Sequence, residues 1–378
     1  MRYRPFGETG WEVSVLGFGA MRLPLKGDTP KEIDIPRARS MVRQAIDAGV
    51  NYIDTAYVYH GGESEPFLGA ALKNGYRDRV KLATKLPPWN IQASTDFDRI
   101  LDEQRRYLDT DVIDCYLLHG LGHKHWPMLR DFGVLDWAER MKAQGKIGHL
   151  GFSFHDHFDL FREIIDAYDK WEFCQIQFNY MDTEFQAGKA GLKLAAEKGL
   201  GVVVMEPLRG GQLVNNLPES VMAIWSSYPE QRSPAEWALR WVWDHAEVST
   251  VLSGMSSMEE LVENLKSADQ AQAGVMSESE LALIDEVYSE YRKTTPIDCT
   301  ACNYCMPCQA DIDIPEIFQR YNDAFRYDDL AKAKRMYNTF MANRQVDRCE
   351  ECFECEEICP QELSIVEWLQ TCHRAFKA

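Results

Sequence analysis

The chain has 378 residues, 45% of them hydrophobic, and a formal net charge of −18. This length and apolar content suit one large domain with a packed core and a second, smaller domain. The acidic balance disfavours a nucleic-acid partner, no apolar run is long enough to cross a membrane, and the N-terminus lacks the apolar stretch of a signal peptide. We expect a cytoplasmic protein, because the cysteines described below suit a reducing compartment.

Residues 13 to about 268 alternate short apolar runs with segments of helical periodicity. Eight runs predict strands buried on both faces of a parallel sheet, because they are almost continuously apolar. These are Val13–Leu16, Asn51–Thr55, Val80–Lys85, Val112–His119, Ile147–Ser153, Phe173–Asn179, Gly201–Met205 and Val248–Ser253. Ahead of them, the segment Phe6–Trp11 predicts a hairpin turn at the base of the sheet.

Helical signals separate the predicted strands. Between the first two strands, apolar residues recur at helical spacing, Pro36 suits the first turn and Gly49 suits the end of the helix. The helix after the sixth strand ends in the same way at Gly199. Eight strand–helix units over about 250 residues match a (β/α)8 TIM barrel. An open doubly wound sheet is the alternative, but Gly17–Met21 lacks the third glycine that often follows its first strand.

Two cysteine runs lie near the C-terminus. The second has the spacing C-x2-C-x2-C-x3-C-P, with which bacterial ferredoxins hold [4Fe–4S] clusters, whereas the first has x2 before its last cysteine and then Gln309. In two-cluster proteins the fourth ligand of one cluster comes from the other run. We therefore predict two [4Fe–4S] clusters, one held by Cys299, Cys302, Cys305 and Cys359, the other by Cys349, Cys352, Cys355 and Cys308.

Zinc and disulfides fit these runs less well. Zinc sites take their cysteines in two pairs, and a disulfide between residues three apart strains the chain. Cys115, Cys174 and Cys372 have no neighbours at ligand spacing, so we expect the first two to be core thiols and assign the third no role.

The rest of the tail predicts helices. Apolar residues from Leu281 to Tyr291 indicate one more helix that closes the barrel domain. Ile314–Arg320 and Leu330–Phe340, between the cysteine runs, are amphipathic without strand alternation. We predict a barrel domain over residues 1–290 and a mainly helical, ferredoxin-like domain with both clusters over residues 291–378.

Four polar residues stand at the carboxyl ends of consecutive predicted strands. Asp54 and Tyr59 close the second strand, Lys85 ends the third and His119 ends the fourth. Barrel enzymes place their chemistry at this rim. An ammonium lowers the pKa of a nearby phenol, a carboxylate keeps the ammonium charged, and a neutral imidazole can orient a carbonyl group. Together these groups could protonate a carbonyl oxygen while hydride reaches the carbon.

At these residues the chain resembles the aldo-keto reductases, over residues 1 to about 290. The likeness is carried by Gly49–Ala56, by Tyr59, by Ala83–Lys85 and by Leu117–His119. It implies that Tyr59 is the general acid, that Lys85 and Asp54 tune it, and that His119 orients the carbonyl. With its cysteine runs, the chain is similar to the iron–sulfur branch of that family.

The resemblance also implies a nicotinamide cofactor, NADP(H) or NAD(H), bound across the later strands. The implied contacts are Gly19, Ala20, Met21, Ser153, Gln177, Met205, Pro207, Leu208, Arg209, Gly211, Gly254, Met255, Ser256, Glu263 and Asn264. Three positions depart from the family pattern. Phe154 replaces an asparagine, Met205 replaces an aromatic residue that stacks on the nicotinamide, and Gly254 and Glu260 replace basic residues that hold the 2′-phosphate.

Other polar groups carry weaker predictions. His123 with His125, and His155 with His157, are spaced i, i+2 on loops, which favours solvent-facing or substrate-lining positions over a metal site. An acidic group beside the second cysteine run is interpreted most simply as a solvated face, and it would also lower the reduction potential of the nearby cluster. Its members are Glu350, Glu351, Glu354, Glu356 and Glu357.

We predict an NAD(P)-dependent oxidoreductase that reduces a small-molecule aldehyde, ketone or keto-sugar to an alcohol. The alternative is a redox relay, because a nicotinamide transfers electrons in pairs as hydride whereas a [4Fe–4S] cluster transfers them singly. In that alternative a flavin joins the two, and the partner is an electron-transfer flavoprotein or a ferredoxin. A third hypothesis is a non-enzymatic scaffold or redox sensor. The complete set of four polar residues at the strand ends argues against it.

Overall fold

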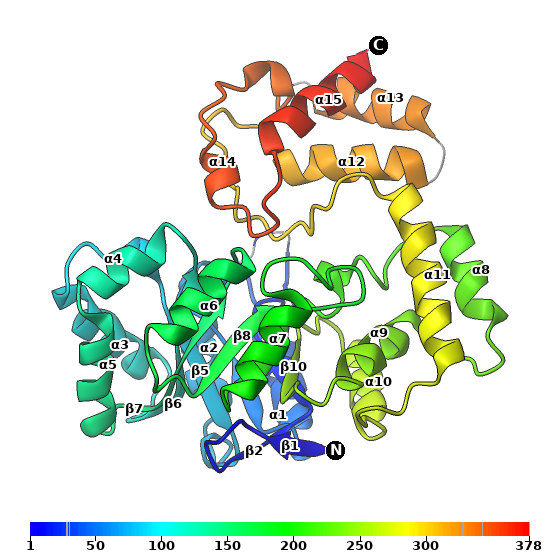
Figure 1. Cartoon of the computed structure of the whole chain (residues 1–378). Coiled ribbons are helices and arrows are strands. Elements are labelled where there is room, and N and C mark those ends of the chain that lie inside the picture. Colours follow the sequence, from blue (N-terminus) through cyan, green and yellow to red (C-terminus); the bar gives the residue numbers. More distant parts are fainter. Residues whose placement is uncertain (28, 30, 327–328, 342, 378) are drawn as a thin grey trace. The chain divides into compact units, whose positions relative to one another are not determined.

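Eight parallel strands close into a barrel within the part of the chain that the computed structural model describes, residues 1–27, 29, 31–326, 329–341 and 343–377 (Figure 1). Around the barrel their order is β10-β3-β4-β5-β6-β7-β8-β9. The strands are β3 (Leu16–Gly19), β4 (Tyr52–Asp54), β5 (Lys81–Leu86), β6 (Ile113–Leu121), β7 (Ile147–Phe154), β8 (Phe173–Gln177), β9 (Gly201–Met205) and β10 (Thr250–Ser253). The predicted (β/α)8 barrel is confirmed, and seven of the eight predicted strands differ from these only at their ends.

The first predicted strand, Val13–Leu16, is wrong. The structure divides it between the barrel strand β3 and β2 (Glu12–Ser14), which pairs antiparallel with β1 (Tyr3–Pro5). Val13 is apolar because it joins a buried cluster beneath the barrel, and not because it lies in the barrel wall. The apolar run therefore spans two elements with different partners.

The β1–β2 hairpin closes the base of the barrel, as the predicted turn over Phe6–Trp11 suggested. The buried ring of Phe6 lies 5.7 Å from the ring of Tyr52 and 5.2 Å from that of Phe173, which are the first residues of β4 and β8. Gly7 in the turn has φ +55°, and a Cβ atom there would lie 2.3 Å from the backbone nitrogen of Gly201. Glycine is therefore needed for the hairpin to approach β9.

Helices follow the strands along the chain. They are α1 (Ile35–Asp47), α2 (Ser64–Ala71), α3 (Thr95–Tyr107), α4 (His125–Asp131), α5 (Val134–Ala143), α6 (Phe158–Asp166), α7 (Gly188–Glu197), α9 (Pro234–Trp243) and α10 (Met258–Ala268). In α1 the predicted apolar face is buried, the Asp34 side chain caps the start by accepting from the Arg37 amide, and Gly49 follows the end with φ +101°. None of the helices described is both long and apolar enough to span a bilayer.

By their contacts, the residues fall into two compact units, Met1–Pro207 with Ala235–Met276, and Leu208–Pro234 with Ser277–Ala378. The first unit holds the barrel strands. The second holds α8 (Glu219–Ser227), α11 (Glu278–Thr294), α12 (Ile314–Arg326), α13 (Leu330–Phe340), α14 (Glu354–Glu357) and α15 (Ile365–Lys377). The helices predicted in the tail are present, and the predicted domain boundary near residue 290 stays a prediction.

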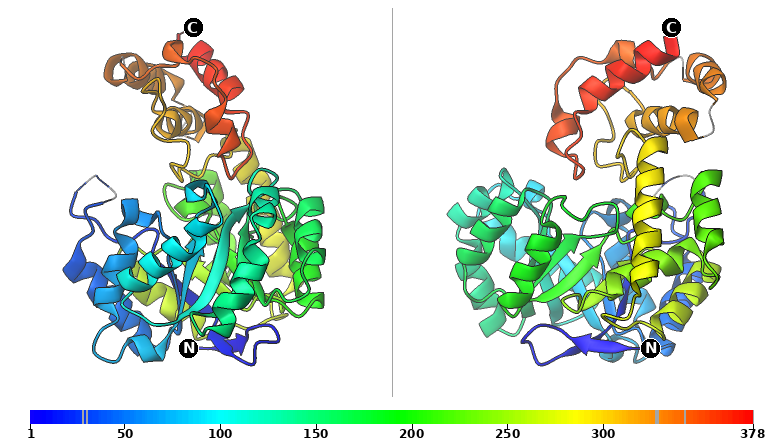
Figure 2. Two further views of the ribbon diagram at one scale, coloured as in Figure 1. Left: turned by 90° about the vertical axis from the view of Figure 1, so that its left-hand side faces the viewer. Right: turned by 45° about the vertical axis from the view of Figure 1, so that its right-hand side comes forward.

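Helices α12, α13 and α15 pack around one core in the second unit (Figure 2). Tyr337 is fully buried there. Its hydroxyl accepts a hydrogen bond from the Val346 amide at 3.0 Å and lies 2.7 Å from Nδ1 of His373. The cysteine runs lie along the edge of this core, which fixes the loops that carry them.

The second unit contains two copies of one loop-and-helix arrangement. The backbone is left-handed at Ala301 and Asn303 in the first cysteine run, with φ 52° and 63°, and at Glu351 and Phe353 in the second, with φ 53° and 59°. Each pair of residues flanks the second cysteine of its run. Helices α12 and α15 then start six residues after the last cysteine of each run. The two runs therefore fold alike, although their sequences share little besides the cysteines.

A buried polar network ties β5 to helices α2 and α3. Oε1 of Glu65 accepts hydrogen bonds from Thr84 Oγ1 at 2.5 Å and from Gln104 Nε2 at 2.8 Å. The same Gln104 amide donates to the backbone oxygen of Lys85 at 3.0 Å, and Tyr116 donates to Gln104 Oε1 at 2.7 Å. The network thus positions the end of β5.

Burial raises the pKa of Glu65 from 4.5 to about 7. When folding raises the pKa of a carboxyl, the free energy of unfolding falls as the pH rises from the unfolded-state pKa to the folded-state pKa of that group. Ionisation of Glu65 therefore destabilises the folded protein at high pH. We expect Glu65→Gln, which keeps the acceptor oxygen, to raise the free energy of unfolding at pH 8 by about 1–3 kcal/mol, and by less than about 1 kcal/mol at pH 5. Urea unfolding followed by circular dichroism measures this.

The control for this change is Glu163→Gln, which removes an exposed carboxylate from α6. It should alter the free energy of unfolding by no more than about 0.5 kcal/mol at either pH. A Glu65→Gln variant less stable than the parent at pH 8 would show that ionised Glu65 stabilises the network.

Candidate active site and iron–sulfur sites

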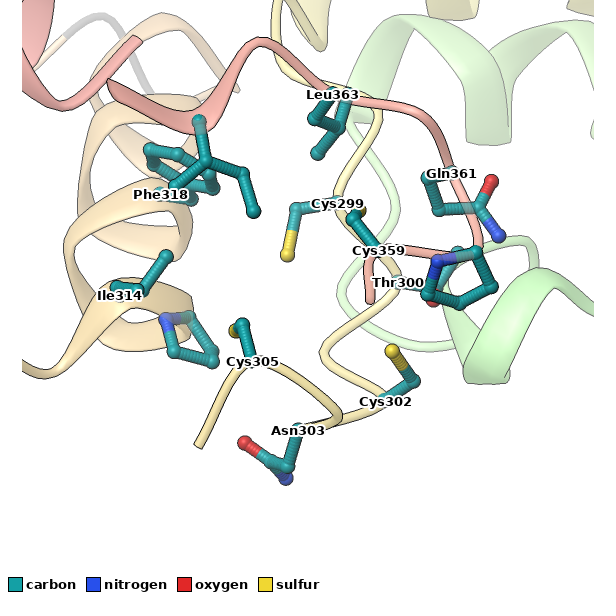
Figure 3. Close-up of a pocket in the computed structure, with 13 residues that line it drawn as sticks. Cys299, Thr300, Cys302, Asn303, Cys305, Ile314, Phe318, Cys359, Gln361 and Leu363 are labelled. Atoms are coloured by element: carbon teal, nitrogen blue, oxygen red, sulfur yellow. The ribbon is translucent and has the colours of Figure 1, made fainter. Parts of the chain in front are cut away.

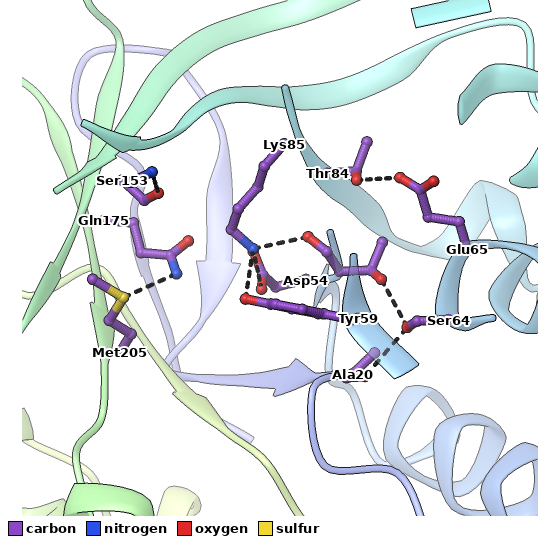
Figure 4. Close-up of polar contacts among 12 residues, drawn as sticks. Ala20, Asp54, Tyr59, Ser64, Glu65, Thr84, Lys85, Ser153, Gln175 and Met205 are labelled. Atoms are coloured by element: carbon purple, nitrogen blue, oxygen red, sulfur yellow. Dashed lines mark hydrogen bonds and ion pairs between the residues drawn. The ribbon is translucent and has the colours of Figure 1, made fainter. Parts of the chain in front are cut away.

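Lys85 brings the predicted catalytic residues together (Figure 4). Its ammonium donates to Oδ1 and Oδ2 of Asp54 at 2.7 and 2.8 Å, to the backbone oxygen of Thr55 at 2.8 Å and to the hydroxyl of Tyr59 at 3.3 Å. Asp54 ends β4, Lys85 lies near the end of β5, and Tyr59 opens the 3₁₀ helix η1 (Tyr59–Gly62). Parallel strands place these ends at the same rim of the barrel.

His119, on β6, lies beside Tyr59. Their rings are 6.2 Å apart and nearly perpendicular, and the ring of Trp89 lies 4.9 Å from His119 on another side. Burial, followed by the nearby Lys85 ammonium, lowers the pKa of His119 well below its usual value. The imidazole is therefore neutral, and its buried Nδ1 has no hydrogen-bond partner among the described residues.

The pKa of Tyr59 differs from the value that the sequence suggested. An ammonium close to a phenol was expected to lower this pKa. In the structure, burial and then the carboxylates of Asp54 and Glu206 raise it well above 10. The charge of Lys85 is already neutralised by Asp54 at closer range, so the phenol keeps its proton.

Asp54 and Lys85 form a fully buried ion pair. Burial raises the pKa of Asp54 and lowers that of Lys85, and their mutual attraction opposes both shifts. Because neither group reaches water, removing one would leave the other charge uncompensated.

Two further residues of the first unit belong to this rim and were missed from the sequence. Glu206 directly follows β9 and raises the pKa of Tyr59, and Arg22 lies 3.8 Å from Oε1 of Glu206. Arg22 also packs over Gly254, where a Cβ atom would meet its side chain at 3.2 Å. The strand-end rule that selected Lys85 would have selected Glu206 as well.

The residues expected to contact a cofactor fall into two groups. Those of the first unit lie at or after the carboxyl ends of barrel strands; they are Gly19, Ala20, Met21, Ser153, Gln177, Met205, Pro207, Gly254, Met255, Ser256, Glu263 and Asn264. Leu208, Arg209 and Gly211 belong to the second unit. Their roles stay predictions.

Several of these side chains are already fixed by hydrogen bonds. Ser153 Oγ accepts from the Gly120 amide at 2.8 Å, and Gln177 Nε2 donates to Asp182 at 2.9 Å. In the second unit, the buried guanidinium of Arg209 lies 2.9 Å from Oδ1 of Asp298.

Glu260 closes the N-terminus of α10. Its Oε2 accepts from the amide of Ser256 at 2.7 Å and from that of Ser257 at 3.3 Å, while Ser257 Oγ accepts from the Glu260 amide. This reciprocal capping box satisfies amides at the helix start with a carboxylate of the chain itself. An incoming anion would meet negative charge at this helix end.

Four cysteines from both runs line a single pocket in the second unit (Figure 3). They are Cys299, Cys302, Cys305 and Cys359, the set predicted for one cluster. Apolar side chains such as Ile314, Phe318 and Leu363 complete the pocket. Backbone amides of residues 361–363 donate to the Cys359 thiol and oppose the effect of burial, which raises its pKa. Four thiols around one pocket fit a [4Fe–4S] cluster.

The other four cysteines are arranged more openly. Cys308 and Cys352 are close enough to Cys355 for their charges to affect it, and burial, as the largest cause, raises the pKa of Cys355 to about 11. Cys349 packs on the same core, and Cys352 is exposed. Cys308 of the first run therefore lies near Cys355 of the second run, and its assignment to that cluster stays a prediction.

The remaining cysteines lie outside both predicted ligand sets, whereas two of the paired histidines lie near His119. The ring of His125 is 6.0 Å from that of Trp89, and after burial and Lys85, His155 and His125 also lower the pKa of His119. Cys115, Cys174 and Cys372 are buried, free thiols. His123 lies 2.9 Å from Oδ2 of Asp156, and burial lowers the pKa of His155 to about 4.

Comparisons with known proteins agree with this arrangement. Residues 15–289 match the model of the aldo/keto reductase family, and residues 298–364 match that of a 4Fe-4S dicluster domain. The chain is 27% identical over 263 residues to methylglyoxal reductase YeaE of Escherichia coli, covering 68% of this chain and 86% of that protein. It is 25% identical to L-galactose dehydrogenase of Arabidopsis thaliana over 323 residues, covering 77% and 96%.

Among solved structures, the holo form of aldo-keto reductase AKR11C1 from Bacillus halodurans is similar, with a TM-score of 0.63 and 28% identity. The match covers 76% of this chain and 96% of that one. The family match extends over most of the chain and includes every barrel strand. The chain therefore belongs to the aldo-keto reductase family and carries a C-terminal 4Fe-4S dicluster domain.

Proposed function

We propose that the barrel reduces the carbonyl group of a small molecule to an alcohol, with hydride from a nicotinamide cofactor and a proton from Tyr59. The observation that carries the proposal is the buried Lys85 ammonium, which donates to Asp54 and to the Tyr59 hydroxyl at once. The membership of the chain in an oxidoreductase family supports it.

The direction of the Tyr59 proton follows from the donors around it. An ammonium can only donate, so the hydroxyl oxygen of Tyr59 accepts from Lys85 and its hydrogen must point elsewhere. A carbonyl oxygen placed against that hydrogen would receive it. The ammonium would then stabilise the phenolate that remains, and Asp54 would keep the ammonium charged.

His119 is suited to hold the carbonyl in place. Because its imidazole is neutral, one ring N–H can donate to the carbonyl oxygen without competing as a proton source. The neighbouring ring of Trp89, which is partly exposed, offers an apolar wall for the substrate.

A bound nicotinamide would supply the hydride. Ser153 and Gln177 are the residues that we propose to orient its carboxamide. The carboxylate of Glu260 at the start of α10 favours NAD(H), because it would repel a 2′-phosphate.

The substrate that we propose is small and oxygen-rich. Two relatives, named as a methylglyoxal reductase and an L-galactose dehydrogenase, support this class. Because iron–sulfur clusters and free thiols need reducing conditions, we also propose that the protein works in the cytoplasm.

A redox relay is the second candidate, favoured by the dicluster domain in the same chain. In this reading electrons are exchanged one at a time with an electron-transfer flavoprotein or a ferredoxin, and a flavin links them to the two-electron step.

Removal of the Tyr59 hydroxyl tests the general acid. We expect Tyr59→Phe to lower kcat for the reduction of small aldehydes by NADH or NADPH about 10²–10⁴-fold, with an unchanged circular dichroism spectrum. Tyr57→Phe is the matched control, because that hydroxyl lies two residues away and bonds to Glu103 at 2.9 Å. Tyr59→Phe with full activity would refute the assignment.

Removal of the charge on Glu260 tests the cofactor preference. Glu260→Gln keeps an oxygen for the Ser256 amide, so α10 should stay capped. We expect kcat/KM with NADPH to rise about tenfold relative to that with NADH, since one repulsive charge at short range is worth about 1 kcal/mol or more. Glu259→Gln, on the same helical turn, should leave the ratio nearly unchanged. An equal effect of both changes would contradict a specific role of Glu260.

Loss of a cysteine tests the iron–sulfur sites. We expect Cys352→Ala to lower the iron content of anaerobically purified protein and to loosen the tail while the barrel stays folded. The control is Cys372→Ala. This change removes a buried thiol of the same unit to which we assign no ligand role, so the iron content of the variant should match that of the parent. Unchanged iron in the Cys352→Ala protein would overturn the ligand scheme.

A further inference from the structure

The two copies of the cysteine loop differ in the residues that surround their second cysteine. In the first loop the residues around the second cysteine are Thr300, Ala301, Asn303 and Tyr304. At the matching positions of the second loop stand Glu350, Glu351, Phe353 and Glu354. Since both loops have the same left-handed turns, the backbone that presents the cysteines requires neither acidic nor aromatic residues there.

Phe353 is the clearest example of a residue that the backbone of the second loop does not require. It has φ 59°, where Asn303 has φ 63° in the first loop. Asparagine adopts this left-handed conformation readily, whereas a bulky aromatic residue is an outlier. The Phe353 side chain does not gain burial in return, because 48% of it is exposed, and Ile358 nearby is 50% exposed. Local folding therefore gives no reason for a phenylalanine at this position.

Two carboxylates of the second loop, those of Glu351 and Glu354, are held without a cationic partner in the described part of the chain. Glu351 accepts from Gln370 at 2.6 Å, and Glu354 accepts from Gln309 at 2.7 Å, so both are held in place by neutral amides. Among the described residues, neither forms an ion pair with lysine or arginine. Many other surface carboxylates of this protein do, such as Asp96 with Arg99. The second loop thus presents fixed negative charge.

Cys352 lies in the middle of these residues and is the one exposed cysteine of the eight in the two described runs. An iron–sulfur site held there would be the more accessible of the two, because the other set lines a pocket with Ile314, Phe318 and Leu363. Exposed apolar side chains, such as Phe353 and Ile358, and carboxylates close in sequence to an exposed redox ligand have the composition of a protein interface.

We propose that this surface, the acidic loop face, is the docking site for a one-electron carrier protein with a basic face around its redox centre. The acidic loop face comprises Glu350, Glu351, Cys352, Phe353, Glu354, Glu357 and Ile358. The inference rests on the relay as the proposed function and adds to it the place of exchange and the charge of the partner. In each encounter one electron would pass from the site at Cys352 to the oxidised carrier, with no bond made or broken. Two encounters would take up the two electrons of one hydride, after the flavin of the relay has divided that pair.

Binding to a basic carrier tests the docking face. The probe is mitochondrial cytochrome c, with both proteins oxidised so that no electron moves, and isothermal titration calorimetry at low ionic strength measures association. We expect the double change Glu351→Gln and Glu354→Gln, which keeps both hydrogen-bond acceptors, to weaken association about tenfold. The difference should shrink as salt is raised, because screening removes it.

A matched control separates the face from the overall charge of the protein. Asp285→Asn with Glu286→Gln removes two exposed charges from α11 and should leave association within about twofold of the parent. An acidic carrier such as rubredoxin should not bind. If the control pair weakens cytochrome c binding as much as the loop pair, or if the loop pair has no effect, the proposal is wrong.

Phe353→Asn tests the contribution of the exposed apolar side chain. It introduces the residue type that Asn303 provides at the matching position of the first loop. Because asparagine suits φ 59°, the loop should fold at least as well and the iron content should be unchanged. We expect the rate at which the reduced protein transfers electrons to cytochrome c to fall several-fold, at high salt as well as at low salt. An unchanged rate would remove Phe353 from the docking face.

The result of the docking tests does not depend on whether the proposed carbonyl chemistry is correct. The loop variants leave Tyr59, Lys85 and His119 intact, so reduction of aldehydes should stay at the parental rate. If docking fails while Tyr59→Phe is inactive, only the docking face is refuted. If docking succeeds while Tyr59→Phe is fully active, the carbonyl reductase assignment is refuted instead.

Discussion

The buried ammonium of Lys85 is the constraint on which the barrel mouth depends. A charge without access to water must be paired, and both oxygens of Asp54 provide that pairing from the neighbouring strand. The backbone oxygen of Thr55 takes a further hydrogen bond. What remains of the donor capacity of Lys85 is directed at the hydroxyl of Tyr59. The ion pair therefore both orients the phenol and leaves it protonated.

The barrel gives these groups their relative positions. Asp54, Lys85 and His119 come from three strands that are neighbours in the closed sheet, so their spacing follows from the register of β4, β5 and β6. The Glu65 network fixes the backbone of β5 behind the site. Precise placement of the reacting groups thus depends on elements that never touch a substrate.

The sequence predicted the features that rest on local pattern. Continuous apolar runs marked the barrel strands, and cysteine spacing selected Cys299, Cys302, Cys305 and Cys359, which line one pocket. Features that depend on three-dimensional surroundings were missed. Val13 looked like a barrel strand because burial under the barrel leaves the same apolar signal as burial in its wall. The pKa of Tyr59 is raised by burial, then by Asp54 and then by Glu206, a residue far away in the sequence.

The two similar loops of the tail have a consequence for its chemistry. In the predicted ligand scheme each loop contributes three cysteines to one set and its last cysteine to the other, so neither copy would complete four thiolates alone. Assembly of the iron–sulfur centres would therefore be interlocked. Oxidative damage at the exposed Cys352 would also disturb the segment that supplies Cys359 to its neighbour.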